Sequence, residues 1–382
     1  MKDVKMQSFI LHPSSLILFF KVGTMTAQAQ APANRFEPRQ GPTVNLDCQL
    51  GTVRYSPCGR FLAAGAYDAT VRRWEVTDAG FTAMPSLTGH RGWVQALAFH
   101  PDRRRLFTAD SWGEVRSWTY AERQAPPVRT MAAAHDGWIR DLAISPDGRL
   151  LATCGRDQKV RLWSIEDGRK LHELTEHNDD VFSVAFHPDG RSLVSGDLHG
   201  NVKQWDVANG RKMREFACRP LFFNAANFEQ NVGGVRRLVF DAQGRTLACA
   251  GSRARTGGNV QGHPTALLFD WASGQLRHTL VVGDGADGYM YDVAFHATGF
   301  LMGVTSGNPG TGKFFFIRPG EQTPFFLSTR MTNCQSLAVH PNGTRLVVAA
   351  TNAGSNGNGR PLRNGVYAAN MSPLHVWDLP AS

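Results

Sequence analysis

One stretch of the chain has the spacing of a phosphate-binding loop. Residues 306–316 read SGNPGTGKFFF, which contains GxxxxGK. Such a loop holds phosphate only when a helix follows the lysine, because backbone N–H groups and the helix dipole must converge on the anion. Here the strand-like FFFIRPG follows Lys313, and no Ser or Thr follows the lysine to hold magnesium. We therefore interpret the stretch as a glycine-rich turn between two strands, and we expect no cofactor.

The 13 histidines and 6 cysteines are the other candidates for chemistry. The cysteines show no CxxC pair and no metal-ligand spacing, and several lie in apolar runs where a free thiol behaves as a small hydrophobe. His100, His187 and His340 each precede a proline and are interpreted as turn residues. No Ser/His/Asp, HExxH or paired-carboxylate motif occurs in a suitable context. The sequence therefore predicts neither a metal site nor a catalytic site.

The chain is basic, with a formal net charge of +9 and a pI near 9.5. Such a charge favours acidic partners, which include acidic protein surfaces and nucleic acid. The basic residues are spread along the chain, however, and the clusters are short, such as RRR at 103–105. A nucleic-acid interface usually needs a concentrated basic stripe. We therefore interpret the charge as that of a solvated, mildly basic surface, and we do not expect nucleic acid as a partner.

The amino-terminal segment, residues 1–34, differs from the rest. MKDVKMQSFILHPSSLILFFKVG has basic residues followed by apolar runs, and AQA at 27–29 resembles a signal-peptidase site. Pro13, Ser14 and Ser15 interrupt the apolar run, which is too short for a transmembrane helix. We expect a disordered or signal-like leader, or a translation start at Met25. The expected location is the cytoplasm, or a secreted or periplasmic one if the leader is a signal peptide.

The remaining chain repeats one pattern. Each unit has an apolar strand, a Ser/His-Pro-Asp-Gly turn, a second apolar strand, a polar turn and a strand that ends at Trp. Clear copies occupy 53–76, 97–120, 142–165 and 184–207, and weaker copies occupy 238–251, 293–307 and 337–351. No segment shows a sustained helical period. The pattern predicts an all-β protein of seven units, because one sheet cannot bury both of its apolar faces without neighbours.

The repeats resemble those of the WD-repeat β-propellers over residues 35–379. Trp205-Asp206 and Trp377-Asp378 fall at the same place in their units. Elsewhere that place is held by Trp74, Trp118 and Trp163, with Phe269 and Phe315 in units five and six. The resemblance implies one domain, a seven-bladed propeller of four-stranded antiparallel blades. Because VWDLPAS supplies the third strand of unit seven, an N-terminal strand within 35–46 is expected to join the last blade and close the ring.

The resemblance also implies a hydrogen-bonded tetrad that joins a His, a Ser or Thr, an Asp and the strand Trp. Unit three matches it fully, with His135, Thr153, Asp157 and Trp163. Unit four has His199 in the Asp position, and unit two has Trp112 there. We interpret the tetrad as structural, because a buried His tied to an Asp inside a repeat holds a scaffold together.

The family geometry further implies that the residue five positions after each repeat His faces the central axis. These slots hold Gly51, Gln95, Arg140, Phe182, Arg236, Tyr291 and Gln335. Two positions earlier, the rim is expected to hold Trp93, Trp138, Asp180 and Tyr289. Trp, Tyr and Arg are enriched in binding hot spots, and Arg grips carboxylates bidentately. We therefore expect an acidic or C-terminal peptide to dock over the channel mouth.

Three insertions interrupt the repeats, at 215–234, 252–264 and 352–373, and are expected to gather on one face around units five to seven. The leading functional hypothesis is a non-enzymatic scaffold that binds a protein or peptide on this loop-rich face. It would act as a monomer or as part of a larger complex. The alternative is a propeller enzyme of hydrolase or lyase type with a site under the loops of units five to seven.

Overall fold

The computed structural model describes residues 36–78, 80–225, 230–254, 262–307, 310–351 and 371–380. A compact unit begins at Glu37, and the predicted leader lies outside the described residues. Apart from the three-residue 3-10 helix Arg219–Leu221, the regular structure of this part of the chain is β. No helix among these residues is long and apolar enough to span a membrane.

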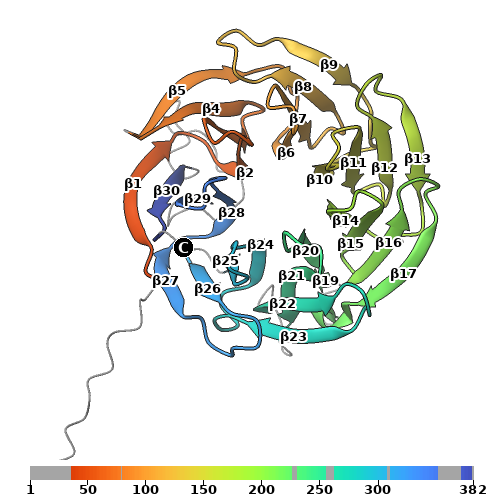
Figure 1. Cartoon of the computed structure of the whole chain (residues 1–382), viewed down its shortest axis with the longest axis vertical. Helices are drawn as coiled ribbons and strands as arrows, with labels where there is room; N and C mark the ends of the chain where they lie inside the picture. The colour runs from red at the N-terminus through yellow and green to blue at the C-terminus, as the bar shows by residue number, and fades with distance from the viewer. Residues whose placement is uncertain are drawn as a thin grey trace, which may run out of the picture. The chain divides into compact units, whose positions relative to one another are not determined.

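The described residues form seven four-stranded antiparallel blades around a central axis, and this confirms the predicted propeller (Figure 1). Blade one contains β2 (Leu50–Tyr55), β3 (Phe61–Ala66), β4 (Val71–Thr77) and β5 (Gly80–Leu87). Blade two contains β6 (Val94–Phe99), β7 (Arg105–Asp110), β8 (Val115–Thr119) and β9 (Pro127–Met131). Blade three contains β10 (Ile139–Ile144), β11 (Leu150–Gly155), β12 (Val160–Ser164) and β13 (Lys170–Leu174).

The next three blades follow the same order. Blade four contains β14 (Val181–Phe186), β15 (Ser192–Asp197), β16 (Asn201–Asp206) and β17 (Lys212–Ala217). Blade five contains β20 (Val235–Phe240), β21 (Thr246–Ala254), β22 (Gly262–Asp270) and β23 (Leu276–Val281). Blade six contains β24 (Tyr289–Phe295), β25 (Leu301–Ser306), β26 (Gly312–Ile317) and β27 (Phe326–Met331). In each blade the first strand lies innermost and the fourth outermost (Figure 1).

Blade seven is assembled from both ends of the propeller. Its order is β1 (Arg39–Leu46), β30 (Ser372–Asp378), β29 (Arg345–Ala350) and β28 (Cys334–Val339). β1 pairs antiparallel with β30, with Val44 opposite Leu374. Val44 and Leu46 pack against a buried cluster that includes Leu374 and Val376. The expected closure of the ring by an N-terminal strand is therefore confirmed.

The turn histidines join neighbouring blades. His100 Nε2 lies 2.7 Å from the carbonyl oxygen of Gly148 in the next blade, and His187 Nε2 lies 2.9 Å from that of Gly244. His340 Nε2 makes the same contact to Gly59 O at 3.2 Å, across the closure of the ring. Since a carbonyl can only accept, Nε2 donates, and Nδ1 of each ring accepts the backbone N–H two residues on. These residues therefore tie the blades together as well as shaping their turns.

The GxxxxGK stretch lies between two strands, as predicted. Lys313 lies in strand β26, and its ammonium group is ion-paired with Asp287. One expectation here is wrong, because Ile317, and not Phe315, holds the Trp position of blade six. Ile317 pairs with Leu301 as Trp205 pairs with Leu193 in blade four. The connection from β25 to β26 is thus longer than its counterparts in blades one to four, which shifts the register that the sequence alone suggests.

The first insertion adds a small hairpin beside blade five. β18 (Phe222–Ala225) pairs with β19 (Gln230–Gly233) and lies against β21. Leu221, at the start of the hairpin, is fully buried in the core cluster of blade five. Residues 226–229 of this insertion, 255–261 of the second and 352–370 of the third lie outside the described residues.

Candidate functional site

Each innermost strand contains a β-bulge at the same place. In all seven described inner strands, the pairing register with the second strand shifts across a single residue. In β2 the shift falls between Leu50 and Thr52, and in β10 between Ile139 and Asp141. A bulge sets two residues of one strand opposite one of its partner, so that strict alternation of sides is lost there. The bulged positions are the seven slots predicted to face the axis, and both the slot and its successor can therefore turn toward the channel.

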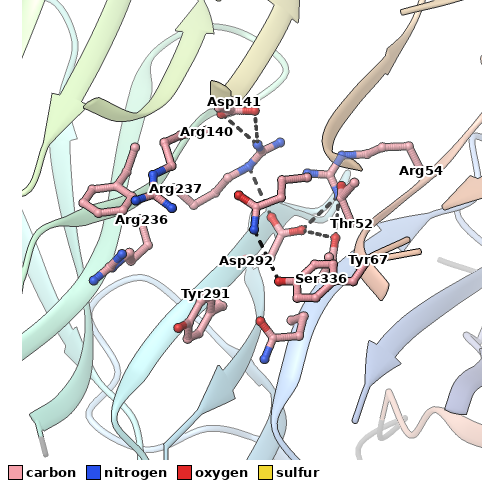
Figure 2. Close-up of a pocket in the computed structure, with 14 residues that line it drawn as sticks. Thr52, Arg54, Tyr67, Arg140, Asp141, Arg236, Arg237, Tyr291, Asp292 and Ser336 are labelled. Atoms are coloured by element: carbon pink, nitrogen blue, oxygen red, sulfur yellow. Dashed lines mark hydrogen bonds and ion pairs between the residues drawn. The ribbon is translucent and has the colours of Figure 1, made fainter. Parts of the chain in front are cut away.

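The slot residues meet on the wall of one cavity of about 220 Å³ at the axis (Figure 2). They are Gly51, Gln95, Arg140, Phe182, Arg236, Tyr291 and Gln335. The next residues of five strands and two further side chains complete the wall, namely Thr52, Arg54, Tyr67, Asp141, Arg237, Asp292 and Ser336. Residues from blades one to seven thus converge on a single polar chamber.

Aromatic rings and guanidinium groups form a stacked row along the rim. The Tyr67 and Trp93 rings are parallel with centroids 4.6 Å apart, and Trp93 meets Trp138 edge-on at 5.5 Å. The Arg140 guanidinium lies 4.6 Å from the Trp138 ring centroid and 5.1 Å from that of Phe182. Such cation–π contacts fix the side chains and cover their faces. The predicted rim and slot residues of blades two to four therefore form one continuous surface.

The row continues into blades five and six through Arg236. Its guanidinium lies 4.0 Å from the Phe182 ring centroid and 4.7 Å from that of Tyr289. Tyr289 and Tyr291 are edge-on at 5.8 Å, and the hairpin residues Phe223 and Val232 pack against them. Arg236 is thus held between two aromatic rings, and the inserted hairpin supports this side of the mouth.

The two slot arginines differ in their partners. Arg140 is ion-paired with the rim residue Asp180 at 2.8 Å. Within the described part of the chain, Arg236 makes no ion pair, and its Nε is buried without a hydrogen-bond partner. Asp180 therefore already occupies Arg140, whereas no carboxylate of the described residues is paired with Arg236.

A belt of buried charges lies beside the slots, and the sequence reasoning missed it. Asp292 of blade six lies 3.0 Å from Arg54 of blade one and 3.2 Å from Arg237 of blade five. Arg237 also lies 3.1 Å from Asp141 of blade three (Figure 2). The sequence signal that could have revealed the belt is a charged residue directly after the slot residue in a largely apolar strand, as at Asp141, Arg237 and Asp292. Two arginines and two aspartates make the belt neutral.

Hydrogen bonds complete the belt. Ser336 Oγ donates to Asp292 at 2.8 Å, and Ser183 Oγ donates to Asp141 at the same distance. Burial opposes ionisation of Asp292, but Arg54 and Arg237 outweigh it and hold the pKa of Asp292 below its ordinary value. Burial also raises the pKa of Tyr67, on the cavity wall, to about 12. Asp292 is therefore ionised and Tyr67 is neutral at neutral pH.

The structural tetrad is present in three blades. In blade three, His135 Nδ1 lies 2.8 Å from Asp157 and Nε2 lies 2.7 Å from Thr153 Oγ1, to which Trp163 donates at 2.9 Å. Burial lowers the pKa of His135 below its ordinary value although Asp157 opposes this. The Thr hydroxyl can therefore donate to Nε2 while Nδ1–H donates to the carboxylate.

The expectation that blades two and four lack the tetrad Asp is wrong. Asp110 lies 2.9 Å from His90 Nδ1, and Asp197 lies 2.8 Å from His177 Nδ1. Both aspartates end the second strand of their blade, whereas Asp157 lies two positions later in the turn. The carboxylate can reach the His from either position, so the number of residues between the tetrad His and Asp differs between blades. Trp112 and His199 are consequently free for other contacts.

This correction predicts different effects for two substitutions in blade four. Asp197→Ala should lower the free energy of unfolding by about 2 kcal/mol, because His177 and the Asn201 amide lose a buried charged acceptor. His199→Ala should cost less than about 1 kcal/mol, because His199 is partly exposed and pairs with Asp179. Urea unfolding of both variants measures the difference, and a larger effect of His199→Ala would contradict the assignment.

One group in the described part of the chain could in principle hold a metal ion, namely His90, Asp110 and Glu114. Both ring nitrogens of His90 are engaged, since Nδ1 contacts Asp110 and Nε2 contacts Thr108. Glu114 is ion-paired with Arg116. The side chains of His90 and Asp110 are thus already used in the tetrad, and a metal ion would have to displace their hydrogen bonds.

Comparison with known proteins points to the same architecture. The family model of the WD domain, G-beta repeat, matches residues 44–75, 82–119, 126–164 and 168–206. The chain is 36% identical over 67 residues to "Nuclear distribution protein PAC1" of Arthroderma otae, a match that covers 18% of this chain and 14% of that protein. It is 35% identical over 72 residues to "Actin-interacting protein 1" of Drosophila melanogaster, which covers 19% and 12%.

The matches to these relatives span less than one fifth of the chain and of each relative, so they identify repeats and not a whole protein. The four matched repeats fall on the strands of blades one to four. Blades five to seven, built from the weaker repeats, continue the same strand order. Residues 44–206 therefore contain WD repeats, and the described chain has the fold of a seven-bladed β-propeller.

Proposed function

We propose that this protein is a non-enzymatic scaffold that binds an acidic peptide segment of a partner protein at the channel mouth. The observation that carries the proposal is the state of Arg236. Its guanidinium carbon lies over two aromatic rings, 4.0 Å and 4.7 Å from their centroids, and it has no carboxylate partner within the described residues. Its N–H edge is the part left to bind, and a carboxylate in the plane of the group fits that edge bidentately.

The surroundings of Arg236 support this choice of ligand. The chamber of about 220 Å³ can admit a carboxylate-bearing side chain or chain end but not a folded domain. The stacked row around it offers large, rigid aromatic surfaces, which gain binding area with little loss of conformational freedom. The belt of Arg54, Asp141, Arg237 and Asp292 is neutral, so the field of Arg236 is not cancelled there. An acidic peptide is therefore the complementary ligand.

The relatives support a protein partner only in general terms. The printed name "Actin-interacting protein 1" records a protein–protein interaction of that relative, which shares 72 aligned residues with this chain. The enzyme alternative needs a site under the loops of blades five to seven, of which residues 255–261 and 352–370 lie outside the described residues. In the chamber, the carboxylates of Asp141 and Asp292 are both bound to arginines, which is a structural arrangement and not an acid–base pair.

Replacing Arg236 tests the proposal. Peptides would be selected from a random library by the wild-type protein, and their affinities compared with those for the variant. Arg236→Ala should weaken binding of the selected acidic peptides at least about tenfold, because a charge-assisted hydrogen bond contributes about 1.5–3 kcal/mol. Arg236→Lys should restore binding only in part, since Lys has neither the planar fork nor the stacking. Arg140→Ala should have a smaller effect, because Arg140 is paired with Asp180.

Arg149→Ala serves as the matched control, because the Arg149 side chain is exposed and lies outside the cavity wall. It should leave the affinities unchanged. Circular dichroism and the melting temperature check that each variant is folded. Equal affinity of wild-type and Arg236→Ala proteins, or selection of peptides without acidic groups, would refute the proposal.

A further inference from the structure

A second cavity adjoins the channel mouth on blades one to three, and we propose that it binds a bulky apolar side chain flanked by a carboxylate. This inference rests on the proposed function and specifies the peptide further. The cavity has a volume of about 550 Å³ and is walled by Tyr67, Trp93, Trp112 and Trp138, with Arg91 and Arg156 beside them. We call it the Trp112 cleft. Tyr67 lines both cavities, so the cleft and the channel mouth share a wall.

Trp112 is exposed, and its indole lies against the backbone of the neighbouring turn. Its side chain is 63% exposed, the largest fraction among the large apolar side chains of the described residues. Its backbone N–H donates to the tetrad residue Asp110 at 2.9 Å, which anchors the turn. A Cβ added at Gly92 would lie 2.3 Å from Trp112 Cδ1, so the indole packs closely against the Gly92 backbone. An exposed indole beside a cavity offers apolar area that a ligand can bury.

The charges around the cleft determine which ligand fits. Arg91 and Arg156 are exposed, and in the described part of the chain neither is ion-paired with a carboxylate. No Asp or Glu lines the cleft. A cationic ligand, such as a methylated lysine, would be repelled although the aromatic walls would suit it. An acidic residue next to an aromatic or large aliphatic side chain matches both the guanidinium groups and the indoles.

Nucleic acid fits these features less well than a peptide. Single strands are usually bound along a groove where cations follow the phosphates and aromatic rings stack on successive bases. The Trp112 cleft is open to solvent and is lined by two arginines, and Trp93 is already stacked on Tyr67 and edge-on to Trp138. A single side chain of the ligand can therefore enter beside Trp112, with its acidic neighbour against Arg91 or Arg156.

The test uses the same library selection with variants of the full chain. Wild-type protein should enrich peptides in which Asp or Glu adjoins Phe, Tyr, Trp or Leu. Trp112→Ala should weaken their binding at least about tenfold and abolish the preference for the apolar residue. Arg91→Gln combined with Arg156→Gln should abolish the preference for the adjoining acid and reduce the salt dependence of binding. Val128→Ala, at an exposed apolar residue outside the cleft, should change nothing.

The outcomes separate this inference from the proposed function. If the selected peptides bind the Trp112 and Arg91/Arg156 variants as tightly as wild type but fail to bind Arg236→Ala, the cleft is not a subsite and the proposed function stands. If the selected peptides also bind Arg236→Ala as tightly as wild type, both the cleft subsite and the proposed function are wrong. Enrichment of basic peptides would overturn the inference. The inference would also be overturned if a fluorescein-labelled oligothymidylate bound in a way that depends on Trp112 and the peptides did not bind.

Discussion

Deleting residues 35–46 is expected to lower the melting temperature of the propeller by roughly 10 °C or more. The deletion removes β1, which is the outermost strand of blade seven and pairs with β30 over its length. About five or six ladder hydrogen bonds, each contributing about 1 kcal/mol, are lost together with the burial of Val44 and Leu46. The deletion also exposes the edge of β30, and an exposed edge strand promotes aggregation.

The matched control removes residues 1–30, which precede the compact unit that begins at Glu37. This truncation should leave the melting temperature unchanged within about 2 °C. Calorimetry measures both midpoints, and size-exclusion chromatography detects aggregation of the protein that lacks residues 35–46. If both truncated proteins melt at the same temperature, β1 does not hold the ring closed.

Asp292→Asn is expected to lower the free energy of unfolding by about 3–5 kcal/mol, because it leaves Arg54 without its counter-charge and leaves Arg237 with Asp141 alone. The amide can still accept a hydrogen bond from Ser336, so the effect reports mainly the loss of charge. Asp78→Asn, at an exposed turn residue, is the control and should change stability by less than about 0.5 kcal/mol. Urea unfolding at pH 7 measures both variants. Equal stability of the two would contradict the role of the belt.

The comparison of wild type with Asp292→Asn also predicts how the stability difference depends on pH. The pKa of Asp292 is depressed in the folded protein, so its stabilising contribution is present above the unfolded-state pKa of about 3.9. That contribution is lost as the pH falls below this value toward the folded-state pKa. The difference in stability between wild type and Asp292→Asn should therefore be constant from pH 7 to about 5 and narrow below pH 4. A difference that grows on acidification would show that Asp292 is not ionised in the native state.

The sequence alone determined the strands, the blades and the residues that face the axis. Hydrophobic alternation and turn residues recur at fixed offsets, and both act over a few neighbouring residues, so a single chain suffices to detect them. The repeats also located one equivalent position in each blade, and the resemblance to WD-repeat propellers implied that these positions face the axis; the cavity wall contains Gln95, Arg140, Phe182, Arg236, Tyr291 and Gln335. The same local signals explain why the GxxxxGK stretch could be assigned to a turn from the strand that follows it.

The tertiary structure decided which charges and rings meet. Arg54 and Asp292 are 238 residues apart in the chain, and their contact depends on the curvature of the whole ring. The pairing of Arg140 with Asp180, the choice of Asp110 and Asp197 for the tetrads, and the place of Ile317 likewise depend on side-chain reach and strand register. A repeat pattern fixes the position of each residue within its blade. It does not fix which residue of another blade satisfies a buried charge, because that depends on distances set only when the blades pack.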